Sequence, residues 1–193
     1  MKKCACLLAL LLCGCIHAPL NDIPLVWKPT SSIGDFGALD VSGFMDVKMQ
    51  VDKFTDTRKD PQLIAENREN AQPRPVTTRD DVGAFVADNM RDTMRKSGLD
   101  VVDSGGQVVI SGEVVDFFVN ETNTYESTVT LRVTARDAAG KTLWSGVTGG
   151  SATRFGRSYK AENYYEVLSD SVLEATYNLM SSPKFEAALT HKG

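Results

Sequence analysis

Every cysteine of this chain lies within its first fifteen residues, at Cys4, Cys6, Cys13 and Cys15. No disulfide can therefore hold the rest of the chain together, as disulfides do in many exported domains. The 193 residues are 42% apolar in the broad sense. A chain of this length buries about two-thirds of its unfolded surface in one core. We expect a single domain stabilised by packing alone.

Composition excludes several classes of protein. The chain is 24% charged, with a net charge of −4 and a pI near 5.2. Disordered chains have fewer apolar residues and a larger net charge. Nucleic-acid binding requires a basic face that releases counterions from phosphate. A protein with several membrane spans would need repeated apolar runs of about 20 residues, and this sequence has one short run, at its start.

Residues 1–15 have the order of an export signal. Two lysines precede a short apolar core at residues 7–12, and Gly14 precedes Cys15. The stretch Leu12-Cys13-Gly14-Cys15 resembles the bacterial lipobox. The resemblance implies that Cys15 receives a diacylglyceryl group, that the chain is cut after Gly14, and that the new amino terminus is acylated. Two alternatives remain open, an apolar helix packed on the domain and a signal in which the cysteines are incidental.

Lipidation would make the membrane the first partner of this chain. Each buried CH₂ contributes about 0.8 kcal/mol, so several acyl chains anchor a protein stably. Removal of residues 1–14 takes away two lysines and no acid, which lowers the net charge from −4 to −6. The residue after Cys15 is Ile16 rather than the aspartate associated with inner-membrane retention. We expect a lipid-anchored protein on the periplasmic face of the outer membrane.

The mature chain divides into a tether and one domain. Residues 15–38 comprise the lipidated cysteine and a stretch with prolines at positions 19, 24 and 29, which favour extended backbone and make a semi-rigid spacer. Three apolar residues, Leu25 to Trp27, could still dock on the domain. Residues 39–193 form the predicted domain.

Hydrophobic periodicity predicts an α+β domain. Alternation indicates strands at 40–53, 99–102, 107–120, 124–136 and 141–153, with a tight hairpin at 137–140. Helical spacing indicates one helix between an N-cap at Thr78 and a C′ glycine at Gly98. A second helix begins with Asn163 as its cap and ends before Pro183. The expected architecture has two layers, a mainly antiparallel sheet of four to five strands with two helices on one face.

The sequence offers little for catalysis. Nucleophilic mechanisms need a base, and the only histidines are His17 and His191, neither on a rigid element. Glu113 and Asp116 stand three apart on a strand, hence on opposite faces unless a bulge intervenes. The sequence contains no metal-ligand pattern. No glycine-rich phosphate-binding loop follows a predicted strand. We expect no catalytic residues, no metal and no cofactor.

Two loops are candidate interaction surfaces. Residues 55–77 form a long polar stretch, and long loops in small domains tend to be functional. The second loop, between the last strand and the last helix, is basic and aromatic on an acidic protein. Its candidate partner-binding residues are Arg154, Phe155, Arg157, Tyr159 and Lys160.

The order of elements resembles the YajG-like family of bacterial outer-membrane lipoproteins. The lipobox Cys15, the stretch from Val51 to Arg58, the helix ending at Gly98, the strand meander and the helix at 163–180 carry this likeness. The resemblance implies an address and a fold rather than a reaction. It favours a non-catalytic envelope protein that binds a protein partner in the periplasm. A more distant resemblance, to auxiliary lipoproteins of lipid-transport systems, leaves open an alternative in which the domain carries lipid or a small hydrophobic ligand.

Overall fold

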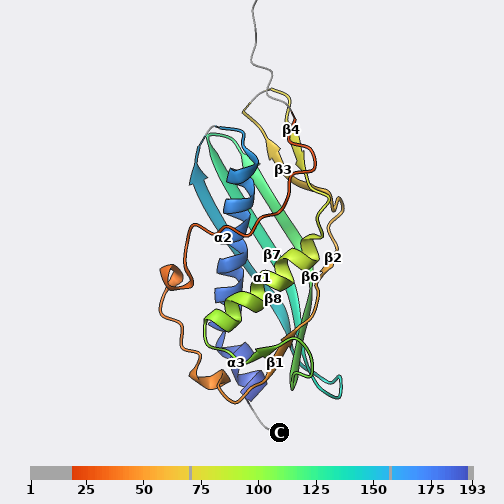
Figure 1. The fold of residues 1–193 in the computed structure, drawn as a ribbon, viewed down its shortest axis with the longest axis vertical. Helices are drawn as coiled ribbons and strands as arrows, with labels where there is room; N and C mark the ends of the chain where they lie inside the picture. Colours follow the sequence, from red (N-terminus) through yellow and green to blue (C-terminus); the bar gives the residue numbers. More distant parts are fainter. Residues whose placement is uncertain (1–18, 70, 157, 191–193) are drawn as a thin grey trace, which may run out of the picture.

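A computed structural model describes residues 19–69, 71–156 and 158–190. Within them lie eight strands, three α-helices and two short 3₁₀ helices (Figure 1). In chain order these are η1 (Ile33–Phe36), η2 (Ser42–Phe44), β1 (Met49–Val51), β2 (Thr55–Asp56), β3 (Leu63–Asn67), β4 (Arg74–Thr77), α1 (Val82–Lys96), β5 (Val101–Val102), β6 (Val108–Glu121), β7 (Thr124–Asp137), β8 (Thr142–Phe155), α2 (Ala161–Met180) and α3 (Pro183–Thr190). The α+β class is confirmed.

The sheet is larger than predicted, and it is mixed. β6, β7 and β8 form an antiparallel meander of three 14-residue strands. β1, β2 and β3 run parallel to β6, β5 runs parallel to β1, and β4 is antiparallel to β3. The predicted count of four to five strands is wrong, because β2, β3 and β4 all come from the polar stretch 55–77. Three apolar residues of this stretch, Ile64, Ala65 and Val76, are completely buried and join the core.

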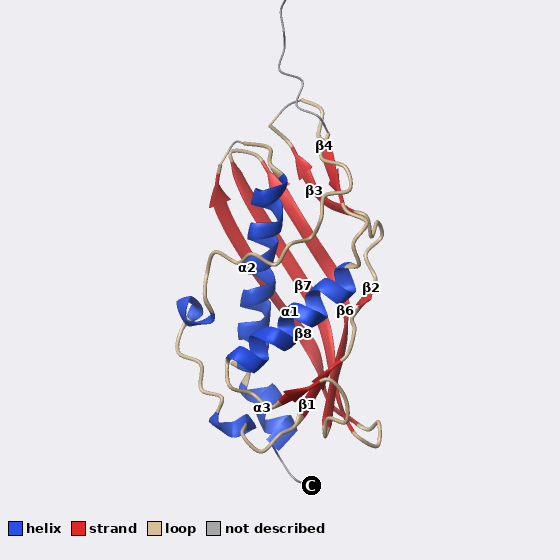
Figure 2. Ribbon diagram, in the orientation of Figure 1, coloured by secondary structure: helices blue, strands red, loops and turns tan. Residues whose placement is uncertain are grey.

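All three α-helices cover the same face of the sheet, and none of the described helices lies on the other face (Figure 2). The alternation predicted for β7 is confirmed. Val129, Leu131 and Val133 are completely buried, whereas Thr128 and Arg132 point to the face without helices. An antiparallel sheet with one solvated face shows this pattern of burial.

Small residues bring α2 unusually close to the sheet. A Cβ atom built on Gly150 of β8 would lie 2.2 Å from the carbonyl oxygen of Ser171 in α2. The hydroxyl of Ser127 in β7 donates to the carbonyl of Val167 at 2.9 Å, and that of Thr148 donates to the carbonyl of Ala175 at 2.9 Å. Both hydroxyls are hydrogen-bonded to carbonyl groups of the helix, so the close interface leaves neither of them buried without a partner.

The helix boundaries differ from the prediction at three places. Asp81, rather than Thr78, caps α1, and its carboxylate accepts from the amide of Ala84 at 2.9 Å. Lys160 precedes α2, and Asn163 lies within its first turn. Pro183 begins α3 instead of only ending α2, since proline fits the first turn of a helix.

Several local signals predicted the backbone correctly. Gly98 has φ +94° after α1, and Gly140 has φ +85° in the hairpin between β7 and β8. The predicted strand 40–53 is only partly a strand: it contains η2 and then the three residues of β1. β1 is short because its neighbours β5 and β6 pair with it over only two and three residues.

We expect Gly150→Ala to destabilise the domain by about 1–3 kcal/mol, because the new methyl group would overlap backbone of α2 that cannot rotate away. Urea unfolding followed by circular dichroism measures the change. Gly34→Ala is the matched control, since its methyl group would meet only the Ser32 hydroxyl at 3.9 Å. Equal stabilities of the two variants would contradict the close contact.

Candidate functional site

The first described residues add to the edge of the sheet. The amide of Thr77, at the end of β4, donates to the carbonyl of Leu20 at 3.1 Å, and the amide of Ile23 donates to the carbonyl of Thr77 at 2.8 Å. The hydroxyl of Thr78 donates to the carbonyl of Ile23 at 2.8 Å. Residues 20–23 are therefore bound to the domain by their backbone. Cys15 lies outside the described residues.

The chain then crosses α2 and is bound there as well (Figure 1). Asp170, which is 7% exposed, accepts from the amides of Thr30 at 2.7 Å and Ser31 at 2.9 Å, and from the Thr30 hydroxyl at 2.6 Å. The amide of Lys28 donates to the hydroxyl of Ser169 at 3.1 Å. A buried carboxylate that accepts three hydrogen bonds holds its partners firmly. We call residues 19–36 the docked segment.

Glu166 of α2 joins the docked segment to β8. Its carboxylate, 5% exposed, pairs with Lys28 at 2.9 Å and with the guanidinium of Arg154. Lys28 also pairs with Glu162 one turn earlier on α2. Because the carboxylate is buried, both cations are needed to compensate the cost of removing it from water.

The structure separates the predicted partner-binding residues. Arg154 forms an ion pair with Glu166. Tyr159 is 7% exposed and has a φ of +34°. The guanidinium of Arg74 stacks on the Tyr159 ring, 4.1 Å from its centroid. Phe155, by contrast, is 81% exposed, and Lys160 is also exposed. Arg157 lies outside the described residues. Sequence patterns could not distinguish the buried tyrosine from the exposed phenylalanine, because both fall in the short stretch between the predicted last strand and the predicted last helix.

A buried tyrosine cluster lies beneath this loop. The hydroxyl of Tyr164 donates to the carboxylate of Glu121, and the rings of Tyr125 and Tyr164 meet edge to face at 5.1 Å. Burial, reinforced by Glu121, raises the pKa of Tyr125 to about 12 and raises the pKa of Tyr164 further. Asn163, the residue predicted as a helix cap, donates to the Tyr125 hydroxyl at 3.2 Å. Burial thus favours the neutral hydroxyl of both tyrosines, which pack against each other in the core.

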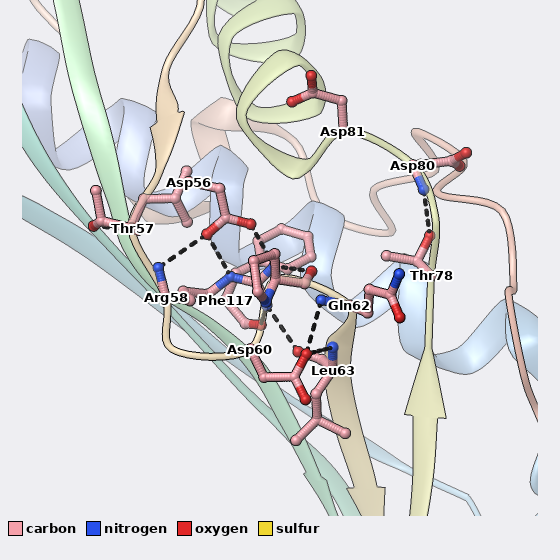
Figure 3. A network of polar contacts seen from close by, with 12 residues as sticks. Asp56, Thr57, Arg58, Asp60, Gln62, Leu63, Thr78, Asp80, Asp81 and Phe117 are labelled. Carbon is pink, nitrogen blue, oxygen red and sulfur yellow. Dashed lines mark hydrogen bonds and ion pairs between the residues drawn. The ribbon is translucent and has the colours of Figure 1, made fainter.

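Arg58 organises the polar stretch that follows β2 (Figure 3). Its guanidinium binds both carboxylate oxygens of Asp56 at 2.7 and 2.9 Å. It also donates to the carbonyls of Pro61 at 2.6 Å, Leu63 at 2.8 Å and Phe117 at 3.1 Å. All five N–H groups of the side chain thus have acceptors. Arg58 ties the loop to β6, so this part of the predicted interaction loop has a structural role.

A polar hollow of about 480 Å³ lies next to these contacts. Asp80 and Asp81 line it, but Asp80 accepts from the amide of Leu25 at 2.7 Å, and Asp81 caps α1 and pairs with Lys53. In Figure 3 both carboxylates lie apart from the contacts of Arg58. Within the part of the chain that the structure describes, no group of three or more His, Cys, Asp or Glu side chains could hold a metal ion.

Glu113 and Asp116 lie on the same face of β6, contrary to the simple expectation. A bulge between Val114 and Asp116 shifts the register, so Glu113 faces Arg132 and Asp116 faces Thr130, both on the face without helices. Glu113 pairs with Arg132. Burial raises the pKa of Asp116. The two carboxylates therefore have separate surroundings, one ion-paired and one partly desolvated.

A smaller, more apolar hollow of about 220 Å³ lies between the docked segment and the two long helices. It is lined by Trp27 and Ile33 of the segment, Thr93 of α1 and Leu173 of α2, among others. Trp27 closes one side through an edge contact with Phe85 at 6.1 Å.

Comparison with known proteins shows a shared fold without close relatives. No family model and no curated protein matches the chain. The crystal structure of protein XCC0632 from Xanthomonas campestris, of the DUF330 family, is 11% identical and superposes with a TM-score of 0.55 over 86% of this chain and 93% of that chain. This likeness shows that the two chains have the same fold.

More distant matches are a PelC dodecamer from Paraburkholderia phytofirmans and lipoprotein GNA1162 from Neisseria meningitidis. PelC is 17% identical with a TM-score of 0.41, covering 67% of this chain and 85% of its own. GNA1162 is 12% identical with a TM-score of 0.36, covering 58% and 88%. These TM-scores are too low to show a shared fold.

Among the helices of the described residues, none is long and apolar enough to cross a bilayer.

We expect Asp170→Ala to loosen the docked segment. Loss of its three hydrogen bonds should cost about 1–3 kcal/mol of stability and speed proteolytic cleavage between residues 28 and 36. Limited proteolysis with mass mapping measures this. Asp88→Ala is the matched control, because that exposed carboxylate pairs with Arg91 on its own helix. Equal cleavage rates in the two variants would show that Asp170 does not hold the segment.

Proposed function

We propose that this chain is a non-catalytic, lipid-anchored envelope protein that binds a protein partner in the periplasm. The observation that carries the proposal is the position of the lipobox cysteine, five residues before a segment bound to the domain by its own backbone. An acyl group at Cys15 would thus be attached to a folded body through a very short connection. A YajG-like outer-membrane assignment is the finer form of this proposal.

The carboxylates support a structural rather than a catalytic role. Glu166, Asp170, Asp56 and Asp81 each accept hydrogen bonds or ion pairs that hold segments of the fold together. Catalytic acids and bases are instead poised toward a substrate cleft. Asp116 has a raised pKa but stands on an open sheet face with its neighbour Glu113 already paired.

The face without helices is the surface we propose for the partner. A row across three strands joins Glu113 of β6, Arg132 of β7 and Val147 of β8. Val147 is 66% exposed, and Val115, next to the bulge, is 39% exposed. Exposed apolar side chains beside an arginine are typical of protein interfaces.

The alternative, a carrier of lipid or a small hydrophobic ligand, has one supporting feature, the apolar hollow beneath the docked segment. Its volume of about 220 Å³ is below the roughly 300–1,000 Å³ of most ligand sites. An acyl chain would have to displace the docked segment. Lipid that copurifies with the protein, detected by mass spectrometry, would favour this alternative.

We expect Cys15→Ser to release the protein from the membrane into the soluble periplasmic fraction, because the acyl chains supply the anchoring free energy. Cell fractionation and intact-mass measurement test this. Cys13→Ser is the matched control and should stay membrane-bound with acyl groups on Cys15. Retention of Cys15→Ser in the membrane would refute the anchor.

We expect a photoreactive residue at position 147 to crosslink a periplasmic protein in living cells. The same probe at Met45, which is 65% exposed on the loop after η2, is the control. Arg132→Glu should weaken the product formed at position 147, since it reverses the charge of the neighbouring side chain in the row. Identical products from both positions would argue against the open face.

A further inference from the structure

The short connection to Cys15 fixes which end of the domain meets the membrane, if the lipid anchor proposed above is present. Among the described residues, which begin at position 19, Leu20 is the first whose backbone is hydrogen-bonded to the sheet. Five extended residues span at most about 17 Å. The 14-residue strands of the meander are each about 48 Å long. The connection is therefore much shorter than the domain.

Leu20 lies at one end of this elongated molecule. In Figure 1 the docked segment begins beside β4, near the end where β8 finishes and α2 begins, while η2 and α3 lie at the opposite end. The amide of Leu20 donates to the hydroxyl of Tyr159, 3.2 Å away, in the loop between β8 and α2. Leu20, five residues after Cys15, is thus in direct contact with that loop.

The same loop begins with the most exposed large apolar side chain of the described residues. Phe155 is the last residue of β8 and pairs with Thr124, the first residue of β7, so it stands at the rim of the sheet. It is 81% exposed. Tyr159, four residues later in the chain, accepts a hydrogen bond from Leu20, and the end of β8 lies at the same end of the molecule as the start of the docked segment (Figure 1).

The chemistry of this rim suits a lipid surface. Aromatic rings partition into the interfacial region of a bilayer, and lysine ammonium groups bind anionic headgroups. Lys160 is exposed just before α2. An acidic mature chain would otherwise be repelled by anionic lipid, and an exposed lysine between β8 and α2 counters this repulsion locally. Tyr159, the residue before Lys160, is packed under the guanidinium of Arg74.

We infer that the rim carrying Phe155 and Lys160 rests on the lipid surface, with the Phe155 ring in the interfacial region. The occupant of this exposed patch is then the membrane in which Cys15 is anchored. The domain stands on the bilayer by this rim, and its opposite end, with η2 and α3, points into the aqueous compartment.

The absence of other thiols makes a direct test available. Cys4, Cys6 and Cys13 are removed with residues 1–14, and the lipidated Cys15 sulfur is a thioether. A cysteine introduced by Phe155→Cys is therefore the only free thiol of the mature lipoprotein that can carry a thiol-reactive, environment-sensitive fluorophore. The purified lipoprotein is placed in vesicles of phosphatidylethanolamine and phosphatidylglycerol. Quenching by brominated lipid and by aqueous iodide then reports the depth of the label. Met45→Cys and Val147→Cys are controls on the far end and the open face.

We expect brominated lipid to quench the label at position 155 at least about twofold more than the label at position 45, with reduced access for iodide. Lys160→Cys supplies a second probe on the same rim, so the test survives if the first variant folds poorly. Equal iodide quenching of the labels at 155, 160 and 45 would overturn the inference. Intact mass and vesicle flotation distinguish the two failures: an unacylated, non-floating protein refutes the anchor itself, whereas an acylated, floating protein with exposed labels refutes only this orientation.

Discussion

The close packing of α2 on β7 and β8 is the contact on which the other parts of the molecule depend. Gly150 leaves room for the helix backbone, and the hydroxyls of Ser127 and Thr148 bind carbonyls of that helix. With one face of α2 packed on the sheet, its remaining faces contact other parts of the domain. One side presents Glu166 and Asp170 to the docked segment, and the helix also meets α1 and α3. With no disulfide available, this packing has to supply the stability that crosslinks supply in many exported domains.

Charged side chains in this protein mainly tie segments together. Arg58 satisfies all its donors on one loop and on β6, and Glu166 compensates two cations at once. Removing either partner of such an arrangement leaves a buried group unpaired, which costs more than the pairing gains. This explains why stretches that look like solvated surface in the sequence are part of the structure. It also leaves the exposed groups as the ones available to partners, and among these Val147 lies on the open sheet face and Phe155 at its rim.

The proposed function follows from the way these surfaces are placed relative to the chain's attachment point. The docked segment converts a proline-containing stretch into part of the domain, so little free chain separates Cys15 from the sheet. In the proposed arrangement, one end of the domain would rest on the membrane, and the open face of β6, β7 and β8 would point sideways into the compartment. The fold shared with XCC0632 shows that this arrangement of strands and helices recurs at very low sequence identity.

The amino-acid sequence by itself determined the α+β class, the long meander, the two long helices, and the turn glycines Gly98 and Gly140, because these depend on local periodicity and backbone freedom. It also predicted lipidation from the lipobox-like residues 12–15, and it confined every cysteine to the first fifteen residues. Only the tertiary structure decided that residues 55–77 contribute three short strands, since such strands exist through pairing with β6 and with each other. It likewise decided that Tyr159 is buried while Phe155 is exposed, because burial depends on neighbours such as Arg74 and Leu20 that are distant in the chain.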